Sequence, residues 1–268
     1  MKYGMSQNSL IVMNGNKTSK YPHITDIIQI MKDSNLLIES NLVEMQNPST
    51  LEIPIKNPSK IICLAKNYVD HAKEMGVSSK DIPALSINPS LFLKPPSSLI
   101  GPGENIIIPP QCEKVHHEVE LAVVIGKKGK HITVDKSYDY IFGYSIILDI
   151  TARNIQSVAK KNGKPWFQSK GYDTFAPLGP LIVDSKEIND PQNLSLELKV
   201  NDDIKQKGNT RDMIFKIKEI ISYVSTIVSL EPGDIIATGT PSGVGPLSKG
   251  DKVIATIESI GKLEVGVV

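Results

Sequence analysis

The sequence has little cysteine, almost no excess of charge and no long hydrophobic run. Its two cysteines, Cys63 and Cys112, are too few and too far apart to form a disulfide framework. The 30 basic and 29 acidic side chains leave a net charge of +1, so no basic surface for a nucleic acid or an anionic membrane is indicated. No hydrophobic run approaches the ~18 residues that a membrane-spanning helix needs. No nucleic acid and no membrane is therefore expected as a partner.

The N-terminus also lacks the features of a signal peptide. The polar residues Ser6, Gln7 and Asn8 lie where a signal peptide has its hydrophobic stretch. With 40% hydrophobic and 22% charged residues, the composition is that of an ordinary globular protein. We therefore expect a cytoplasmic enzyme or binding protein.

Two regions of the chain differ in their sequence patterns. Residues 1–57 carry few structural signals and end in a proline-containing stretch, which predicts a small N-terminal subdomain and a linker. From residue 58 onward, short β-branched runs alternate with Gly/Pro turns, which is typical of a sandwich or rolled barrel. Helices are expected over 151–161 and 214–229. The predicted class is mainly β with a few helices (α+β), with strands in the main domain at 61–64, 106–108, 119–125, 141–150, 181–183, 194–200, 234–237 and 252–257.

The segment 115–126 carries two glutamates in a hydrophobic run. Side chains of a strand alternate between its faces, so Glu118 and Glu120 point to the same side, together with His116. Neighbouring carboxylates repel each other, and the hydrophobic run predicts a buried strand. A cation, a basic partner or exposure to solvent resolves this conflict. A Glu-x-Glu pair in a strand is usually a solvent-exposed acidic face, and that alternative stays open from this segment alone.

A third carboxylate, Asp149, ends the hydrophobic run 143–148 and precedes the first expected helix. An acid in this place either caps the helix N-terminus or belongs to a site at the end of a strand. Three carboxylates with no cysteine nearby suit a hard divalent ion, Mg²⁺ or Mn²⁺, better than zinc. Three side-chain ligands also leave coordination positions for water and substrate oxygens.

Six segments resemble the fumarylacetoacetate hydrolase family and follow one another in the family's order along the chain after Pro58. They are AKNYVDHAKEMG (65–76), LFLKPPSSLIGPG (91–103), HHEVELAVVIG (116–126), GYSIILDITARNIQ (143–156), KPWFQSKGYDTFAPLGP (164–180) and EPGDIIATGTPSGVG (231–245). The resemblance implies a roll of twisted mixed β-sheets, with a catalytic domain over 58–268 and a short N-terminal domain before it. It also implies a homodimer.

The resemblance implies that Glu118, Glu120 and Asp149 bind a divalent ion, normally Mg²⁺, with Mn²⁺ as the second option. Family substrates are small 2-oxo or 1,3-diketo acids, which chelate such an ion through carboxylate and 2-oxo oxygens. The ion stabilises the enolate that forms when the neighbouring C–C bond breaks. The implied activity is therefore a metal-dependent hydrolase or lyase that hydrolyses acylpyruvates or decarboxylates oxaloacetate.

The resemblance also assigns residues around the ion. Lys170 matches the family's site lysine, which balances charge and stabilises the enolate. His71 and Glu74 match a pair on a mobile segment that closes over the substrate and activates water. Three positions apart on a helix, the two share a face, so the glutamate can orient the imidazole. Substrate binding is assigned to Arg153, Gln156 and Thr240.

Two other functions stay open. One is an isomerase or decarboxylase of the 5-carboxymethyl-2-hydroxymuconate type, and the other is a catalytically silent relative that binds a metal or ligand. The presence of all three carboxylates, of Lys170 and of the His71–Glu74 pair argues against the silent relative. The sequence departs from the family's common pattern at Leu148, Asn154 and Lys66.

Overall fold

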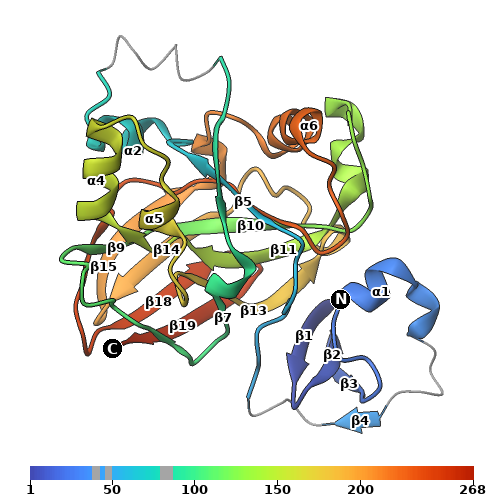
Figure 1. Cartoon of the computed structure of the whole chain (residues 1–268). Coiled ribbons are helices and arrows are strands. Elements are labelled where there is room, and N and C mark those ends of the chain that lie inside the picture. The colour runs from blue at the N-terminus through green and yellow to red at the C-terminus, as the bar shows by residue number, and fades with distance from the viewer. Residues whose placement is uncertain (38–42, 46–49, 79–86) are drawn as a thin grey trace.

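The structure is a computed structural model, and it describes residues 1–37, 43–45, 50–78 and 87–268. Strands dominate these residues (Figure 1), which confirms the mainly β class with a few helices. No helix in these ranges is long and apolar enough to cross a membrane. The strands are β1 (Lys2–Ser6), β2 (Ser9–Asn14), β3 (Lys17–Tyr21), β4 (Val43–Met45), β5 (Ile61–Ala65), β6 (Ser90–Lys94), β7 (Leu99–Ile100), β8 (Asn105–Ile106), β9 (Val115–His117), β10 (Val119–Ile125), β11 (Ile141–Leu148), β12 (Thr151–Ala152), β13 (Ala176–Asp184), β14 (Ser195–Val200), β15 (Asp203–Asn209), β16 (Ile235–Ala237), β17 (Gly245–Leu247), β18 (Lys252–Ile257) and β19 (Gly261–Val267). The α-helices are α1 (Ile28–Lys32), α2 (Val69–Glu74), α4 (Arg153–Lys161), α5 (Phe167–Lys170) and α6 (Ile217–Ile227), and the 3₁₀ helices are η1 (Ser34–Leu36), η3 (Pro96–Ser98), η4 (Val134–Tyr140), η5 (Ser185–Glu187) and η6 (Thr210–Asp212).

One large mixed sheet runs through the molecule in the order β4-β3-β2-β1-β13-β11-β10-β16-β5-β6, and β7 pairs with β13 beside it. Within it, β10 is antiparallel to both neighbours, β11 and β16, whereas β16 is parallel to β5. A second sheet has the order β15-β14-β18-β19-β8, and a short one has the order β12-β9-β17. The glutamate-bearing strand β10 therefore lies inside the large sheet and not at its edge.

Both faces of β10 are buried. Leu121, Val123 and Ile125 pack into a hydrophobic core that they share with α6 and the second sheet. Ala122 and Val124 point the other way, into a core that they share with α1 and the N-terminal strands. This alternation is the period of two expected for a strand, and it separates the two cores on opposite faces of the large sheet.

The N-terminal strands β1 to β4 form an antiparallel meander, which Figure 1 shows beside the main body together with α1. The meander continues the large sheet, because Lys2 pairs with Val183 and Tyr3 with Ile182. The N-terminal meander is thus joined to the site-bearing sheet by a backbone ladder, and the separate subdomain over 1–57 stays a prediction.

Two expected helices form with shorter spans than predicted. The helix expected from residue 151 begins at Arg153, because Thr151 and Ala152 pair with β9 as strand β12. The helix expected from residue 214 begins at Ile217, because the backbone amide of Ile214 donates to the carbonyl of Asn67 at 2.7 Å. In both cases, residues that helical spacing assigns to the start of the helix form hydrogen bonds with a distant segment of the chain instead.

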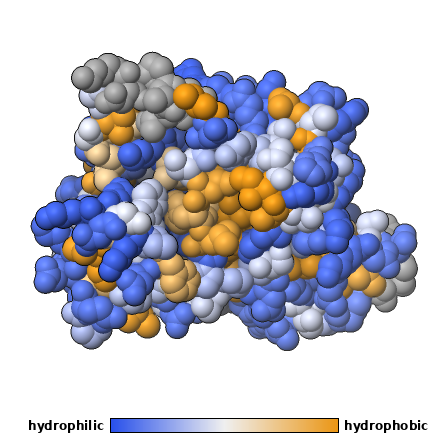
Figure 2. All heavy atoms as spheres, turned by 45° about the horizontal axis from the view of Figure 1, so that its top comes forward, coloured by the Kyte–Doolittle hydropathy of each residue, from blue (hydrophilic) through white to orange (hydrophobic). Residues whose placement is uncertain are grey.

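One face of the molecule carries a hydrophobic patch near the middle of the view in Figure 2, with mostly hydrophilic residues around it. Among the exposed large hydrophobic residues, Leu93 of the terminal strand β6 and Phe167 of α5 are 56% and 61% exposed and line one cavity. Exposed apolar surface of this kind is common at protein contacts. The homodimer expected from the sequence stays a prediction.

Candidate active site

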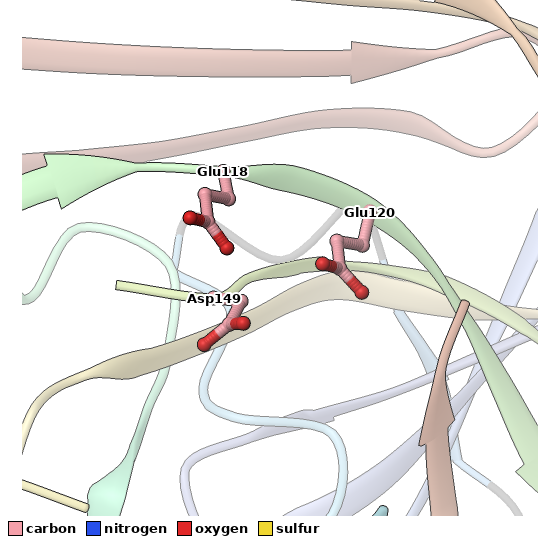
Figure 3. A group of neighbouring side chains, drawn as sticks. All are labelled: Glu118, Glu120 and Asp149. Carbon is pink, nitrogen blue, oxygen red and sulfur yellow. The ribbon is translucent and has the colours of Figure 1, made fainter. Parts of the chain in front are cut away.

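The three predicted metal ligands come from two neighbouring strands. Glu120 is the second residue of β10, Glu118 precedes that strand, and Asp149 follows the last residue of β11. The backbone amide of Asp149 donates to the carbonyl of Glu118 at 2.9 Å, which continues the ladder between the two strands. Figure 3 shows the three carboxylates turned toward one another. Each offers one oxygen within 4.8 Å of the others, so the three can hold a single ion.

All three carboxylates are buried. Glu118 is 4% exposed, and Glu120 and Asp149 are each 1% exposed. The alternative of a solvent-exposed acidic face is therefore wrong. Capping by Asp149 is wrong as well, because α4 begins after Ala152 and no side chain caps it. Buried carboxylates require positive charge nearby.

Two basic residues supply part of that charge. The ammonium of Lys170 lies 3.0 Å from Oε2 of Glu118 and 2.5 Å from Oδ2 of Asp149, and Arg153 donates to the other oxygen of Glu118. Burial alone raises the pKa of Glu118, but the charges of Lys170 and Arg153 outweigh it and hold that pKa well below its usual range. Glu118 is therefore ionised at neutral pH.

Glu120 is placed differently. Its Oε2 accepts a 2.7 Å hydrogen bond from the backbone amide of Gly239, and no basic side chain of the described residues pairs with it. Burial and then the charges of Asp149 and Glu118 raise the pKa of Glu120 well above its usual range. A cation between the three carboxylates would ionise Glu120, and its binding would release a proton.

Lys94 is a site residue that the sequence did not reveal. It is 1% exposed, and its ammonium lies 2.9 Å from Oδ1 of Asp149. Its three protons go to the backbone carbonyls of Ile150, Lys170 and Phe175, at 3.0, 2.7 and 2.9 Å. Oδ1 of Asp149 is consequently a buried acceptor without a hydrogen bond among the described residues. A buried oxygen of this kind, in a set of three carboxylates, fits a hard divalent ion.

Replacing Lys94 by methionine is expected to destabilise the fold by about 3–5 kcal/mol, because it removes the hydrogen bonds to the buried carbonyls of Ile150 and Lys170 and a counter-charge of Asp149. Urea unfolding measures this change, with Lys136→Met at an exposed position as the control. A loss below about 1 kcal/mol, the usual net contribution of a single hydrogen bond, would show that Lys94 does not hold this part of the site together.

His71 and Glu74 form the predicted pair. His71 lies in α2 and is buried, and its Nδ1 is 3.1 Å from Oε2 of Glu74. The other oxygen of Glu74 accepts a 3.0 Å hydrogen bond from the backbone amide of Gly243, which fixes the carboxylate. Burial lowers the pKa of His71 below its ordinary value, although Glu118 and Glu74 oppose this. His71 is thus neutral at pH 7, the form that a general base needs.

The three residues assigned to substrate binding also lie in this region. Arg153 donates to Oε1 of Gln156 at 2.7 Å, and its Nε has no partner in the described chain. The hydroxyl of Thr240 donates to the carbonyl of Val119 at 2.8 Å and accepts from Gln206 at 2.7 Å. The proton of Thr240 is therefore engaged within the protein, and the substrate-binding role of all three residues stays a prediction.

One pocket is lined by every predicted site residue except Glu74, which lies behind His71. Its remaining walls were not predicted as site residues. They are Leu64, Ala65, Lys66, Met75, Phe92, Lys160 and Trp166. The structure thus gathers residues from β5, α2, β6, β10, α4 and α5 around the three carboxylates.

A comparison with protein-family models decides the family. Residues 60–268 match the model of the fumarylacetoacetate (FAA) hydrolase C-terminal domain. The chain belongs to the fumarylacetoacetate hydrolase family. Relatives in this family are enzymes: the mitochondrial oxaloacetate tautomerase FAHD1 of Arabidopsis thaliana is 44% identical over 219 residues, which are 82% of this chain and 95% of that protein.

Solved structures of the fumarylacetoacetate hydrolase family share the whole fold. Maleylpyruvate hydrolase from Sphingobium sp. SYK-6, in complex with Mn²⁺ and pyruvate, has a TM-score of 0.83 at 33% identity, and the match covers 100% of this chain and 99% of that one. The 5-carboxymethyl-2-hydroxymuconate delta-isomerase from Mycobacterium smegmatis has a TM-score of 0.78 at 34% identity, with 100% and 98% coverage. These likenesses confirm the family and the rolled, mixed-sheet fold that the sequence motifs implied.

Proposed function

We propose that this chain is a divalent-metal-dependent enzyme that cleaves a C–C bond in small 2-oxo or 1,3-diketo acids. The observation that carries this proposal is the buried triad Glu118, Glu120 and Asp149, in which Glu120 has no basic partner among the described residues and Oδ1 of Asp149 accepts no hydrogen bond from them. A structural relative binds Mn²⁺ together with pyruvate, a 2-oxo acid. The favoured reactions are hydrolysis of an acylpyruvate and decarboxylation of oxaloacetate.

Mg²⁺ is the proposed ion, with Mn²⁺ as a substitute, because all three ligands are hard carboxylate oxygens. When bound, the ion supplies positive charge for the oxygen on which negative charge develops as the C–C bond breaks. Lys170 adds to this charge from the wall of the pocket. Burial alone lowers the pKa of Lys170, but Asp149 and Glu118 outweigh it and raise that pKa, so the ammonium stays protonated.

His71 is proposed as the base that activates water for hydrolysis. Glu74 holds Nδ1 of the ring, which leaves Nε2 to take a proton from a water molecule in the pocket. The water oxygen bonds to the distal carbonyl carbon, and the C–C bond breaks with its electron pair moving to the pyruvate part. The carbon that receives this pair is then protonated, so the products are pyruvate and a carboxylic acid.

The pKa of His71 predicts the acid side of the pH profile. Because burial lowers this pKa below its ordinary value, the ring stays neutral to lower pH than an ordinary histidine does, and kcat/KM for hydrolysis is expected to fall only below the range in which histidine ordinarily titrates. Rates measured between about pH 5 and 8 at saturating Mg²⁺, the range in which histidine ordinarily titrates, check this. A decline that begins above neutral pH would contradict a depressed pKa for the catalytic base.

A second candidate is the interconversion of the keto and enol forms of oxaloacetate. The observation that favours it is the 44% identity to the oxaloacetate tautomerase of Arabidopsis thaliana. The hydroxymuconate isomerase with the same fold points to a related proton transfer. Both reactions need the same stabilisation of an enolate but no attacking water, so the products separate them from hydrolysis.

The test is a paired assay of acetylpyruvate and oxaloacetate with Mg²⁺, and again after removal of the metal with EDTA. Pyruvate formation from either substrate, lost with EDTA and restored by Mg²⁺ or Mn²⁺, supports C–C bond cleavage. Metal-dependent ketonisation of enol-oxaloacetate without pyruvate formation favours the second candidate. The absence of any turnover with metal would leave the hydroxymuconate isomerase and the silent relative as the explanations.

A further inference from the structure

Gln206 carries an amide that is buried on a largely exposed strand. It is the one buried residue of β15 and is 1% exposed. Its Oε1 accepts from the backbone amide of Val119 at 3.1 Å and lies 3.0 Å from Nδ1 of His117. Its Nε2 donates to the hydroxyl of Thr240 at 2.7 Å and to the carbonyl of Pro241 at 3.0 Å. All four hydrogen-bonding positions of this amide are therefore used, which fixes the side chain and the groups around it.

Side chains replace the strand ladder beside the backbone that joins the two glutamates of the triad. The ladder between β10 and β16 ends at Ala122. Nearer the triad, both backbone groups of Val119 bond side chains: its amide donates to Gln206, and its carbonyl accepts from Thr240 at 2.8 Å. Because Gln206 also donates to Thr240, these three residues form a closed ring of hydrogen bonds. The ring fixes the backbone midway between the two glutamates, and with it the direction in which both carboxylates leave the strand.

The loop after β16, residues 238–243, reaches both parts of the candidate site. The amide of Gly239 donates to Glu120 of the triad, and the amide of Gly243 donates to Glu74, the partner of the proposed base. The loop lies directly against β15, because a Cβ added at Gly243 would be 2.1 Å from a backbone oxygen of that strand. The φ of Gly243 is +95°, which also favours glycine. Displacement of this loop from β15 would therefore move a metal ligand and the partner of the base together.

We propose that Gln206 is a positioning residue that holds Val119 and the loop 238–243 in one arrangement, and so sets both the metal affinity of the triad and the orientation of the His71–Glu74 pair. This role rests on the proposed function, in which the triad binds a divalent ion and His71 activates water. Gln206 does not line the pocket, so it acts through the ring and the loop and not by contact with the substrate.

The substitution Gln206→Leu tests this role, because leucine fills a similar space and makes none of the four hydrogen bonds. The dissociation constant for Mn²⁺, measured by electron paramagnetic resonance, is expected to rise about 10–100-fold, the usual effect of losing a residue that holds metal ligands in place. At saturating Mn²⁺, ketonisation of enol-oxaloacetate is expected to recover, whereas hydrolysis of an acylpyruvate stays about tenfold or more below the wild-type rate. The difference arises because only hydrolysis needs the His71–Glu74 pair, which the loop orients through Gly243.

A double-mutant cycle with Thr240→Val shows whether Gln206 acts through the ring. Valine keeps the shape of threonine and removes the hydroxyl, so this variant opens the same ring from its other side. Thr240→Val alone is expected to weaken Mn²⁺ binding. The double variant is expected to bind Mn²⁺ about as well as the weaker of the two single variants, because a ring that is already open has nothing further to lose. Independent effects would multiply instead.

Lys207→Leu is the matched control, because this next residue of β15 is exposed and does not line the pocket. It is expected to bind Mn²⁺ and turn over as the wild type does. Circular dichroism shows which variants are folded, and Thr240→Val tests the ring by itself if Gln206→Leu does not fold.

Wild-type Mn²⁺ affinity in folded Gln206→Leu, or in Thr240→Val when that variant is the one tested, overturns the positioning role and leaves the proposed function standing. Effects that multiply in the double variant also overturn it. Weakened Mn²⁺ binding in the variants of a protein that turns over no 2-oxo acid contradicts the proposed function, while the positioning of the metal ligands by Gln206 stands. If the wild type binds no Mn²⁺, both proposals fail.

Discussion

Replacing Asp149 by asparagine is expected to lower kcat/KM with the preferred substrate by about 10³-fold or more, equivalent to about 4 kcal/mol of transition-state stabilisation. The asparagine side chain keeps the size of the aspartate but loses the charge of the oxygen that lacks a hydrogen bond in the buried triad. The substitution also leaves Lys94 and Lys170 without a shared counter-charge. Mn²⁺ titration followed by electron paramagnetic resonance should show that tight metal binding is lost together with activity.

The matched control is Asp139→Asn, at an exposed position outside the pocket, which is expected to bind Mn²⁺ and turn over as the wild type does. Because Asp149 is buried, circular dichroism must show that the variant is folded. A folded Asp149→Asn variant with wild-type Mn²⁺ affinity and activity within tenfold of wild type would remove Asp149 from the metal site.

The substitution His71→Ala is expected to reduce hydrolysis of an acylpyruvate by about 10²–10⁴-fold, the usual contribution of a positioned general base. His71 does not contact the triad through any hydrogen bond in the structure, and its partner is Glu74. Enolisation at the metal is therefore expected to survive in this variant. Steady-state hydrolysis and ketonisation of enol-oxaloacetate, measured on the same preparation, separate the two steps.

His23→Ala is the control, because His23 is exposed and does not belong to the pocket lining. It is expected to leave both rates unchanged. An equal loss of hydrolysis and ketonisation in His71→Ala would instead assign His71 to a proton transfer that both reactions share. Unchanged hydrolysis would exclude His71 as the base.

The common face of Glu118 and Glu120 could be predicted from a short-range rule, whereas the place of Asp149 in the same site was implied by the resemblance to the family. The period of two in a strand puts Glu118 and Glu120 on one face, and the ladder between β10 and β11 brings Asp149 opposite Glu118. The contact between His71 and Glu74 likewise follows from a spacing of three on a helix. Burial of the triad could not be deduced from the segment alone, since an exposed edge strand has the same pattern.

Lys94 shows what local patterns cannot provide. It is one of many lysines in the chain, and its three acceptors belong to residues 150, 170 and 175, which meet only in the folded structure. Lys66 and Lys160 likewise line the pocket only because segments distant in sequence meet there in the folded structure.

For the fold as well, local sequence patterns predicted some elements and failed to predict others. Continuous hydrophobic strands such as β10 and β18 formed residue for residue as expected. Strand β15 was missed because its sequence, DIKQKGN, is polar and its side chains are mostly exposed. The short strand β12 replaced the first turn of an expected helix through its pairing with β9. A partner distant in sequence determined β12, whereas β15 pairs with the neighbouring strand β14 across a short turn.

Exchange of the methyl protons of pyruvate with D₂O, followed by ¹H NMR, tests the central claim most directly. Pyruvate is the ligand of the Mn²⁺-containing relative, and exchange requires an enolate but no bond cleavage. Wild-type protein with Mg²⁺ is expected to catalyse exchange, and EDTA or Asp149→Asn to abolish it. Exchange that continues after complete metal removal, or none in the metal-loaded protein, would contradict enolate stabilisation by an ion at Glu118, Glu120 and Asp149.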